Sequence, residues 1–245
     1  MMSITYQRLL MLAAGLWLAC EPALAGPGGK IAKAAFETFW GRVGLGVLTL
    51  LFLPLIIMVL VREKLAERRS RKDLSFMAAR DARFDWLSIQ QRTKDCFHRI
   101  HSGWDKEDLS DVSGWMTSWY WQNQQQVFLD KWKREGLVNV CNVKRMGSIR
   151  PLLFVHRNLG RAHEGSLLVV SITATMQDYL AKREGGKVVE GSKRYKEVET
   201  VWSFSMDGGE WKVSDIEEGG VSLAYAKLIR ELPPIEATLN SDLPA

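Results

Sequence analysis

The sequence predicts an α+β protein in which three N-terminal helices pack on a bent, cone-like antiparallel sheet, preceded by one transmembrane helix. Three patterns lead to this fold class: a charge-free apolar run at 43–61, helical apolar periodicity over 84–135, and two-residue alternation over 137–218. The predicted segments are a signal peptide at 1–25, a short exported head at 26–42, a transmembrane helix at 43–61, a basic juxtamembrane connector at 62–83, an α+β domain at 84–232 and a disordered tail at 233–245.

Residues 1–25 have the pattern of a secretory signal peptide. Arg8 precedes an apolar run, and Ala23-Leu24-Ala25 is a small-x-small cleavage pattern. The run covers about eleven residues, and at about 1.5 Å per residue it is too short for a hydrocarbon core of about 30 Å. An uncleaved first span and a lipoprotein signal at Cys20 are the weaker alternatives.

Residues 43–61 are predicted to cross a membrane. The run has no charged residue and is long enough to span the hydrocarbon core. Pro54 lies inside it, and a single proline is tolerated as a kink in lipid. The alternative, a buried core helix, suits shorter runs and is rarely followed by a cluster of charges.

A basic stretch at 62–72 directly follows this run. Because the opposite flank at 26–42 has fewer basic residues, the positive-inside rule predicts that the C-terminal side is cytoplasmic. The same cations are candidate contacts with anionic lipid. They are Arg62, Lys64, Arg68, Arg69, Arg71 and Lys72. An RNA-contacting arm is the alternative, but stop-transfer basic residues are common, so nucleic acid is disfavoured as a partner.

Three helices are expected between residues 84 and 135. In the first, apolar residues recur at spacings of three and four from Trp86 to Ile100, and Gly103 is expected to end it. Asp105 is expected to cap a short second helix. Thr117 or Ser118 is expected to cap a third, which Gly136 ends.

Strands are expected from residue 137 onward. Residues 137–156 form one long strand or two, and the stretches 167–176 and 197–206 alternate apolar and polar positions. Residues 207–209, Asp-Gly-Gly, predict a hairpin turn, after which a last strand runs from Trp211 to near Glu218.

The order of these elements resembles the Tim44-like domain, a branch of the nuclear-transport-factor-two-like cone folds. The shared motifs are Asp178-Tyr179, Val188-Val189-Glu190-Gly191, Trp202-Ser203-Phe204, Gly209-Glu210-Trp211 and Ile216. The resemblance covers roughly residues 84–220, and it rests on the order and spacing of the motifs.

This resemblance implies a membrane-associated adaptor at the bacterial inner (plasma) membrane, because bacterial members share the layout of signal, single span and domain. The family's namesake tethers an import-motor chaperone to a mitochondrial channel, and a relative anchors the ribosome to the membrane. This chain has its own predicted spanning helix and lacks the namesake's long chaperone-binding region. Chaperone recruitment is therefore not implied.

Candidate chemistry is sparse in the sequence. Asp178 and Tyr179 would suit an acid–base pair in the hollow of the cone, but an aspartate next to a turn usually makes local backbone bonds. His98 and His101 have a spacing that metal sites use, without further ligands nearby. Three cysteines give no disulfide or metal pattern. We predict no enzyme activity, cofactor or metal.

Tryptophan is abundant, and residues 119–121 (Trp-Tyr-Trp) cannot all face one side of a helix. At least one ring is therefore expected at the surface or at the cone mouth. The candidate cone or partner site consists of Trp119, Tyr120, Trp121, Asp178, Tyr179 and Trp202. The sequence predicts a non-enzymatic adaptor that binds a protein partner or a membrane surface. The alternative is a small-molecule binder, hydrolase or isomerase, which a buried polar residue in a large hollow would favour.

Overall fold

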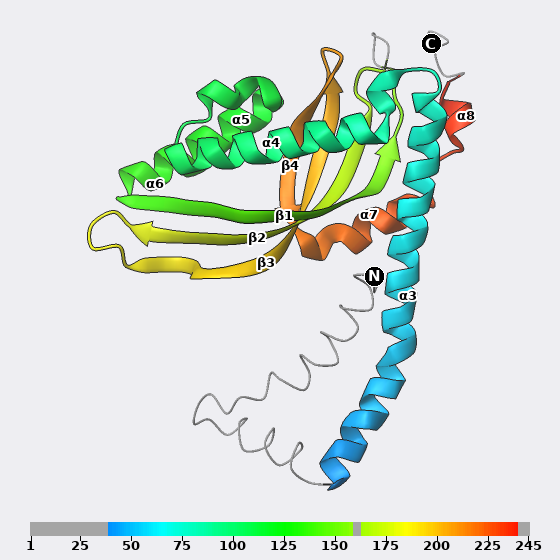
Figure 1. Cartoon of the computed structure of the whole chain (residues 1–245), viewed down its shortest axis with the longest axis horizontal. Helices are drawn as coiled ribbons and strands as arrows, with labels where there is room; N and C mark the ends of the chain where they lie inside the picture. The colour runs from blue at the N-terminus through cyan, green and yellow to red at the C-terminus, as the bar shows by residue number, and fades with distance from the viewer. Residues whose placement is uncertain (1–38, 159–162, 240–245) are drawn as a thin grey trace. The chain divides into compact units, whose positions relative to one another are not determined.

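The computed structural model describes residues 39–158 and 163–239 (Figure 1). The chain divides into two units at the boundary between Val61 and Arg62, which is where the predicted transmembrane helix ends. The predicted signal peptide and nearly all of the predicted head lie outside the described residues, as do residues 240–245.

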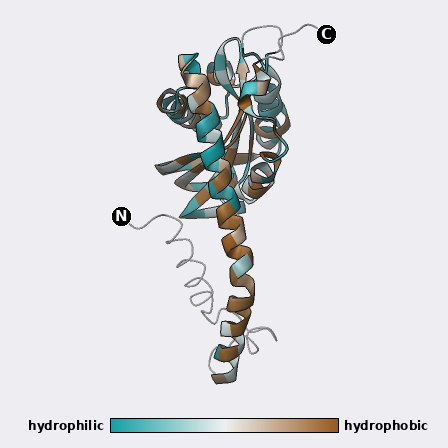
Figure 2. Ribbon diagram, turned by 90° about the vertical axis from the view of Figure 1, so that its right-hand side faces the viewer, coloured by the Kyte–Doolittle hydropathy of each residue, from teal (hydrophilic) through white to brown (hydrophobic). Residues whose placement is uncertain are grey.

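Helix α3 spans Phe39–Ala78 and includes the apolar run with Pro54 inside it. Most of its first half is apolar, as the brown colouring in Figure 2 shows, and large side chains such as Leu50 and Leu51 are exposed. By length and composition, α3 is the one helix of the described chain that could cross a membrane.

The second half of α3 belongs to the folded domain. Ala66, Ser70, Leu74 and Met77 are fully buried, and their spacing of four, four and three places them on one helix face. A domain boundary at Phe84 is therefore too late. A helix that packs along one narrow face needs an apolar residue only at every third or fourth position. The many charged residues between these positions made the buried face difficult to recognise in the sequence.

Helix α4 spans Trp86–Lys106 and has the predicted apolar face, with Ile89, Phe97 and Ile100 buried. The carboxylate of Asp85 accepts a 2.9 Å hydrogen bond from the backbone N–H of Ser88 and caps the helix. The prediction that Gly103 ends α4 is wrong. The helix continues to Lys106 and ends at Glu107, whose φ is +56°.

Gly103 allows close packing against α4 and does not end the helix. A Cβ atom at Gly103 would lie 2.9 Å from a methyl group of Leu109 and 3.0 Å from one of Val112. The predicted second helix is a 3₁₀ helix, η2, at Ser110–Trp115, and Asp105 lies inside α4 and does not cap it. Close contact between α4 and η2 accounts for the glycine.

The predicted third helix is present in three joined parts. These are α5 at Ser118–Asn123, a π-helical turn η3 at Gln124–Leu129, and α6 at Asp130–Arg134. Tyr120 and Leu129 are its buried residues. The wide π turn changes the helical phase, so periodicity of 3.6 residues cannot describe the whole helix.

The sheet is a four-stranded antiparallel meander in the order β1-β2-β3-β4. Its strands are β1 (Leu137–Val155), β2 (Leu167–Lys182), β3 (Val188–Asp207) and β4 (Glu210–Glu218). Register shifts interrupt the β1–β2 ladder at three places, and such bulges bend a sheet. The Asp207–Glu210 hairpin is confirmed, with φ of +64° at Gly208 and +82° at Gly209.

Helices cover both faces of the sheet (Figure 1). The α4–α6 layer covers one face. Helix α7, Ser222–Leu228, covers part of the other, where Ala226 packs with Leu153, Val201 and Ala66 of α3. The sequence analysis predicted only the three N-terminal helices against the sheet, because α7 is too short to show clear periodicity.

The prediction of a disordered tail from Pro233 is wrong for the described part of that segment. Helix α8 spans Ile235–Thr238, and Ile235 is buried in the main core. The Thr238 hydroxyl lies 2.9 Å from Nδ1 of His156. Ile235 and the half-buried Leu239 pack this turn against the core. A segment so short and so close to Pro233 and Pro234 gives little sequence signal.

Candidate functional site

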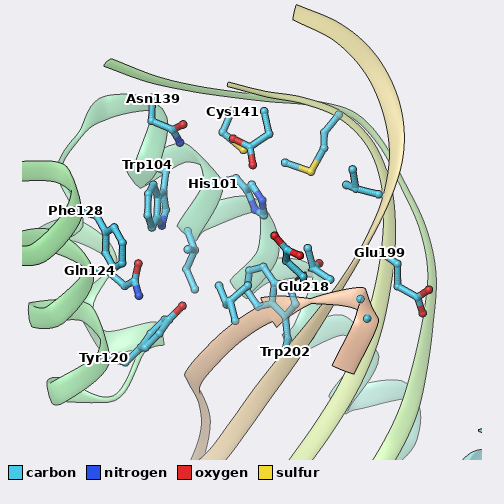
Figure 3. Close-up of a pocket in the computed structure, with 18 of the residues that line it drawn as sticks. His101, Trp104, Tyr120, Gln124, Phe128, Asn139, Cys141, Glu199, Trp202 and Glu218 are labelled. Carbon is cyan, nitrogen blue, oxygen red and sulfur yellow. Dashed lines mark hydrogen bonds between the residues drawn. The ribbon is translucent and has the colours of Figure 1, made fainter. Parts of the chain in front are cut away.

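An open cavity of about 780 Å³ lies between the α4–α6 layer and one face of the sheet. Figure 3 shows Trp104, Gln124 and Phe128 on its helical side and Asn139 and Cys141 on its strand side. Its volume is within the range of about 300–1,000 Å³ that is typical of ligand sites.

Three aromatic rings form the helical wall of the cavity. Trp104 comes from α4, Phe128 from the π turn η3 and Trp132 from α6. Their ring centroids are 5.7–6.5 Å apart, so the three rings form one contiguous aromatic cluster. Phe128 is 37% exposed, and the cluster is therefore accessible to an incoming apolar group.

The acidic side chains of the cavity lining come from the strands. Asp178 on β2 pairs with Cys141 on β1, and residues directly opposite in an antiparallel ladder share a face. Asn139 and Met176 line the same wall. Gly191 of β3, with φ of +79°, lets that strand approach closely, since a Cβ there would lie 2.4 Å from the Asp178 carbonyl oxygen.

Asp178 has no basic partner among the described residues. Burial in the cavity wall raises the pKa of its carboxyl group, and the nearby charge of Glu190 raises it further. Asp178 is nonetheless an exposed residue of β2 at the open cavity, so its carboxylate is accessible to a bound cation or hydrogen-bond donor.

His101 contributes a hydrogen-bond acceptor to the cavity. Burial lowers the pKa of its imidazole to about 4, so the ring is neutral at physiological pH. Its Nδ1 lies 2.7 Å from the carbonyl oxygen of Phe97, which can only accept, so Nδ1 carries the proton. The ring is stacked on Trp202 at 5.7 Å, and Nε2 keeps its lone pair.

Of the predicted site residues, Tyr120, Asp178 and Trp202 line the cavity. Tyr179 does not, because successive residues of a strand point to opposite faces. The ammonium of Lys193 lies 5.8 Å from the centre of its ring. Asp178 and Tyr179 therefore cannot act together in one hollow, and Asp178 lies within β2 and not at its end.

Residues 119–121 diverge as predicted. Trp119 is 71% exposed, Tyr120 is buried at the cavity, and Trp121 packs half-buried against the core. Trp119 and Trp121 do not line the cavity. A helix turns about 100° per residue, so three consecutive rings reach three different environments.

The basic residues of 62–72 divide into two groups. Arg69 donates hydrogen bonds to the carbonyl oxygens of Ile229, Leu232 and Pro233 at 2.7–3.0 Å, so it holds the domain together. The Arg71 guanidinium pairs with Glu67 at 3.0 Å and lies 4.8 Å over the Trp86 ring. Neither side chain is a free surface cation.

The remaining cations form an exposed stripe. Lys64, Arg68 and Lys72 are exposed and follow one another at intervals of four residues, which places them along one side of α3. Arg62 is half-buried. Lys64 also pairs with Glu67 at 2.9 Å. We refer to Lys64, Arg68 and Lys72 as the basic stripe.

Sequence reasoning missed most of the cavity wall. It did not include Trp104, Phe128 or Trp132 in the candidate site, and it considered His101 only as a possible metal ligand. Within residues 39–158 and 163–239, no three His, Cys, Asp or Glu side chains are grouped as metal ligands would be. The usable signal was the aromatic spacing of Phe128 and Trp132 on the third helix, but the π turn that aims them is not visible in the sequence.

The fold and the site therefore define a class of protein: a cone-like α+β domain that has a long apolar helix and an aromatic cavity. The chain belongs to the Tim44-like domain family, whose model matches residues 70–218, more than half of the chain. The match begins inside α3, in agreement with the buried face of that helix.

Among solved structures, the intermembrane-space region of the chloroplast protein ARC6 is similar at 7% sequence identity with a TM-score of 0.35. That similarity covers 52% of this chain and 94% of the ARC6 chain. No curated protein matches the sequence.

Proposed function

We propose that this chain is a non-enzymatic, membrane-anchored adaptor that binds an apolar segment of a partner protein in the aromatic cavity. The observation that carries the proposal is the open cavity of about 780 Å³ with Trp104, Phe128 and Trp132 along one wall. Exposed aromatic surface in a concave site is typical of recognition, because it stabilises a bound state by removing apolar area from water.

The membrane arrangement is part of the same proposal. Residues 43–61 span a bacterial inner membrane once, residues 26–42 are exported after the signal peptide, and the domain from Arg62 onward is cytoplasmic. The basic stripe, Lys64, Arg68 and Lys72, supports this orientation and contacts anionic lipid. The folded domain extends from 62 to 239.

The ionisable groups of the cavity support binding without catalysis. Burial lowers the pKa of His101 to about 4, which makes it a weak base at neutral pH. Desolvation raises the pKa of the Cys141 thiol to about 12, so almost no thiolate is available as a nucleophile.

A second candidate function is binding or conversion of a small molecule in the same cavity. Asp178 favours it, because its carboxylate lines a hollow of several hundred cubic ångströms with a raised pKa. This function predicts a low-molecular-weight occupant and no stable complex with a protein.

Photocrosslinking in whole cells distinguishes the adaptor function from the small-molecule function. The full chain carries p-benzoylphenylalanine in place of Phe128, which lines the cavity, or in place of Tyr195 on β3, which does not. The two positions are matched, since both are aromatic and their exposed fractions are 37% and 42%. The adaptor proposal expects one protein that crosslinks from Phe128 and not from Tyr195.

Crosslinks to lipid or small molecules alone from Phe128 would contradict the adaptor function and favour the second candidate. A reporter fused after Ala245 tests the orientation separately. Activity of a reporter that works only outside the inner membrane would show that the proposed sidedness is wrong.

A further inference from the structure

The charge of the cavity wall is one-sided. The lining contains no lysine or arginine, whereas it contains the carboxylates of Asp178, Glu199 and Glu218. Arg150 pairs with Glu199 at 2.7 Å and compensates that charge. Asp178 and Glu218 have no ion pair among the described residues, so the lining carries uncompensated negative charge.

His101 adds a hydrogen-bond acceptor to these acidic groups. His101 is neutral and keeps the lone pair of Nε2, which accepts a hydrogen bond and cannot donate one. An anionic group would therefore meet two carboxylates and a lone pair. A donor such as an ammonium or guanidinium group would find acceptors.

The aromatic wall suits the same chemistry. The Trp104, Phe128 and Trp132 rings offer π faces that attract cations and apolar area that contacts methylene groups. Lysine and arginine side chains can make both kinds of contact, because each has an apolar stem and a charged end. Aromatic rings on one wall and an unpaired carboxylate on the other match such a side chain within an apolar segment.

We propose, building on the adaptor function above, that the occupant of the cavity is a basic amphipathic segment of a partner protein. Its apolar side chains contact the aromatic cluster, and one of its lysine or arginine side chains pairs with Asp178. Charge complementarity distinguishes this occupant from an acidic segment of equal apolar area. The exposed Asp178 carboxylate is accessible to such a side chain from the cavity.

The test uses the full chain in nanodiscs of zwitterionic phosphatidylcholine, so that the lipid does not attract a basic peptide. Two fluorescent 18-residue peptides have the same leucine positions, and their polar face is lysine in one and glutamate in the other. Anisotropy measures binding, with empty nanodiscs as the blank. We expect the lysine peptide to bind at least about tenfold more tightly, which corresponds to about 1.4 kcal/mol.

The Asp178→Asn variant tests the pairing directly, since it keeps the shape of the side chain and removes its charge. The variant should bind the lysine peptide roughly five- to twentyfold more weakly, and its affinity for the glutamate peptide should be unchanged. Glu197→Gln is the matched control, because Glu197 is an exposed carboxylate of β3 outside the cavity lining. It should change neither affinity by more than about twofold.

Equal binding of the two peptides, or equal effects of the two variants, would overturn the basic-segment proposal and leave the adaptor function standing. Failure of both peptides to bind would also overturn it, while the crosslink from Phe128 decides the adaptor function independently. If dodecylamine binds and the lysine peptide does not, the occupant is a small amine and the assignment to a protein segment is wrong.

Discussion

The guanidinium of Arg69 donates a 2.7 Å hydrogen bond to the carbonyl oxygen of Ile229, 160 residues further along the chain. The same group also bonds to the carbonyl oxygens of Leu232 and Pro233. These three carbonyls lie in the segment between α7 and α8. Arg69 therefore ties the start of the domain to its C-terminal segment.

Arg69→Ala should lower the free energy of unfolding by about 2–3 kcal/mol, because it leaves three carbonyl oxygens without their charged donor. For a domain of this size the melting temperature should fall by roughly 5–10 °C. The measurement is a thermal melt of the detergent-solubilised full chain, followed by tryptophan fluorescence. Arg68→Ala is the control, since Arg68 is exposed, and it should shift the melt by less than about 2 °C. Equal shifts would contradict the assigned role of Arg69.

The basic stripe should set the preference for anionic lipid. Arg68→Gln with Lys72→Gln should reduce that preference by about 1 kcal/mol per residue, up to roughly 30-fold for the pair. Mass spectrometry of the phospholipid that co-purifies with the full chain in detergent measures it. Lys131→Gln with Lys133→Gln on α6 removes the same charge from exposed positions elsewhere. An equal loss in this control would show that the stripe is not a specific lipid contact.

Asp178→Asn should raise the melting temperature slightly at neutral pH, because Asp178 is exposed and solvent screens much of the penalty of its charge. The pKa of Asp178 is raised in the folded state from its ordinary value of 3.8, first by burial and then by Glu190. The ionised carboxylate therefore destabilises the fold above the raised pKa, and this penalty disappears as the pH falls below the unfolded value. Melts of the variant and the natural sequence should differ most at pH 7.5 and converge towards pH 4. A variant that is less stable at pH 7.5 would contradict this account.

Gly191→Ala should destabilise the fold more than Gly186→Ala. Both glycines have positive φ, +79° and +62°, so both substitutions carry a backbone cost of about 1–2 kcal/mol. Only Gly191 also has the Asp178 carbonyl oxygen and the Tyr179 backbone in the way, whereas nothing lies within 4 Å at Gly186. We expect a total cost of roughly 3 kcal/mol or more for Gly191→Ala. Denaturant titration of the two variants measures the difference, and equal costs would show that the β2–β3 approach adjusts freely.

Local patterns were sufficient to predict much of the fold. The helix α4, the alternation of β2 and β3, and the glycine turn between β3 and β4 depend on residues close together in the sequence. The apolar run from residue 43 to 61 is also a local property, and it lies within the helix α3. Periodicity and turn chemistry therefore identified these elements directly.

The candidate site was predicted less well, because it depends on which distant residues meet. Asp178 and Trp202 were identified, but the choice between Asp178 and Tyr179 depends on the face to which each strand residue points. The 3₁₀ helix η2 lies between Trp104 and Phe128, and Phe128 itself lies in the π turn η3; neither element is visible as a periodic pattern. Only the folded chain shows that they form one wall.

The sequence by itself determined the class of this protein: an apolar helix, a basic flank and an α+β domain of the Tim44-like type, all of which follow from short-range patterning. Tertiary structure alone decided that Arg69 holds the C-terminal segment while Arg68 faces solvent, and that Asp178 lies without a counter-ion in an open aromatic cavity. The physical reason is that burial and charge compensation are properties of contacts across the fold, and neighbouring residues of identical type can have opposite surroundings.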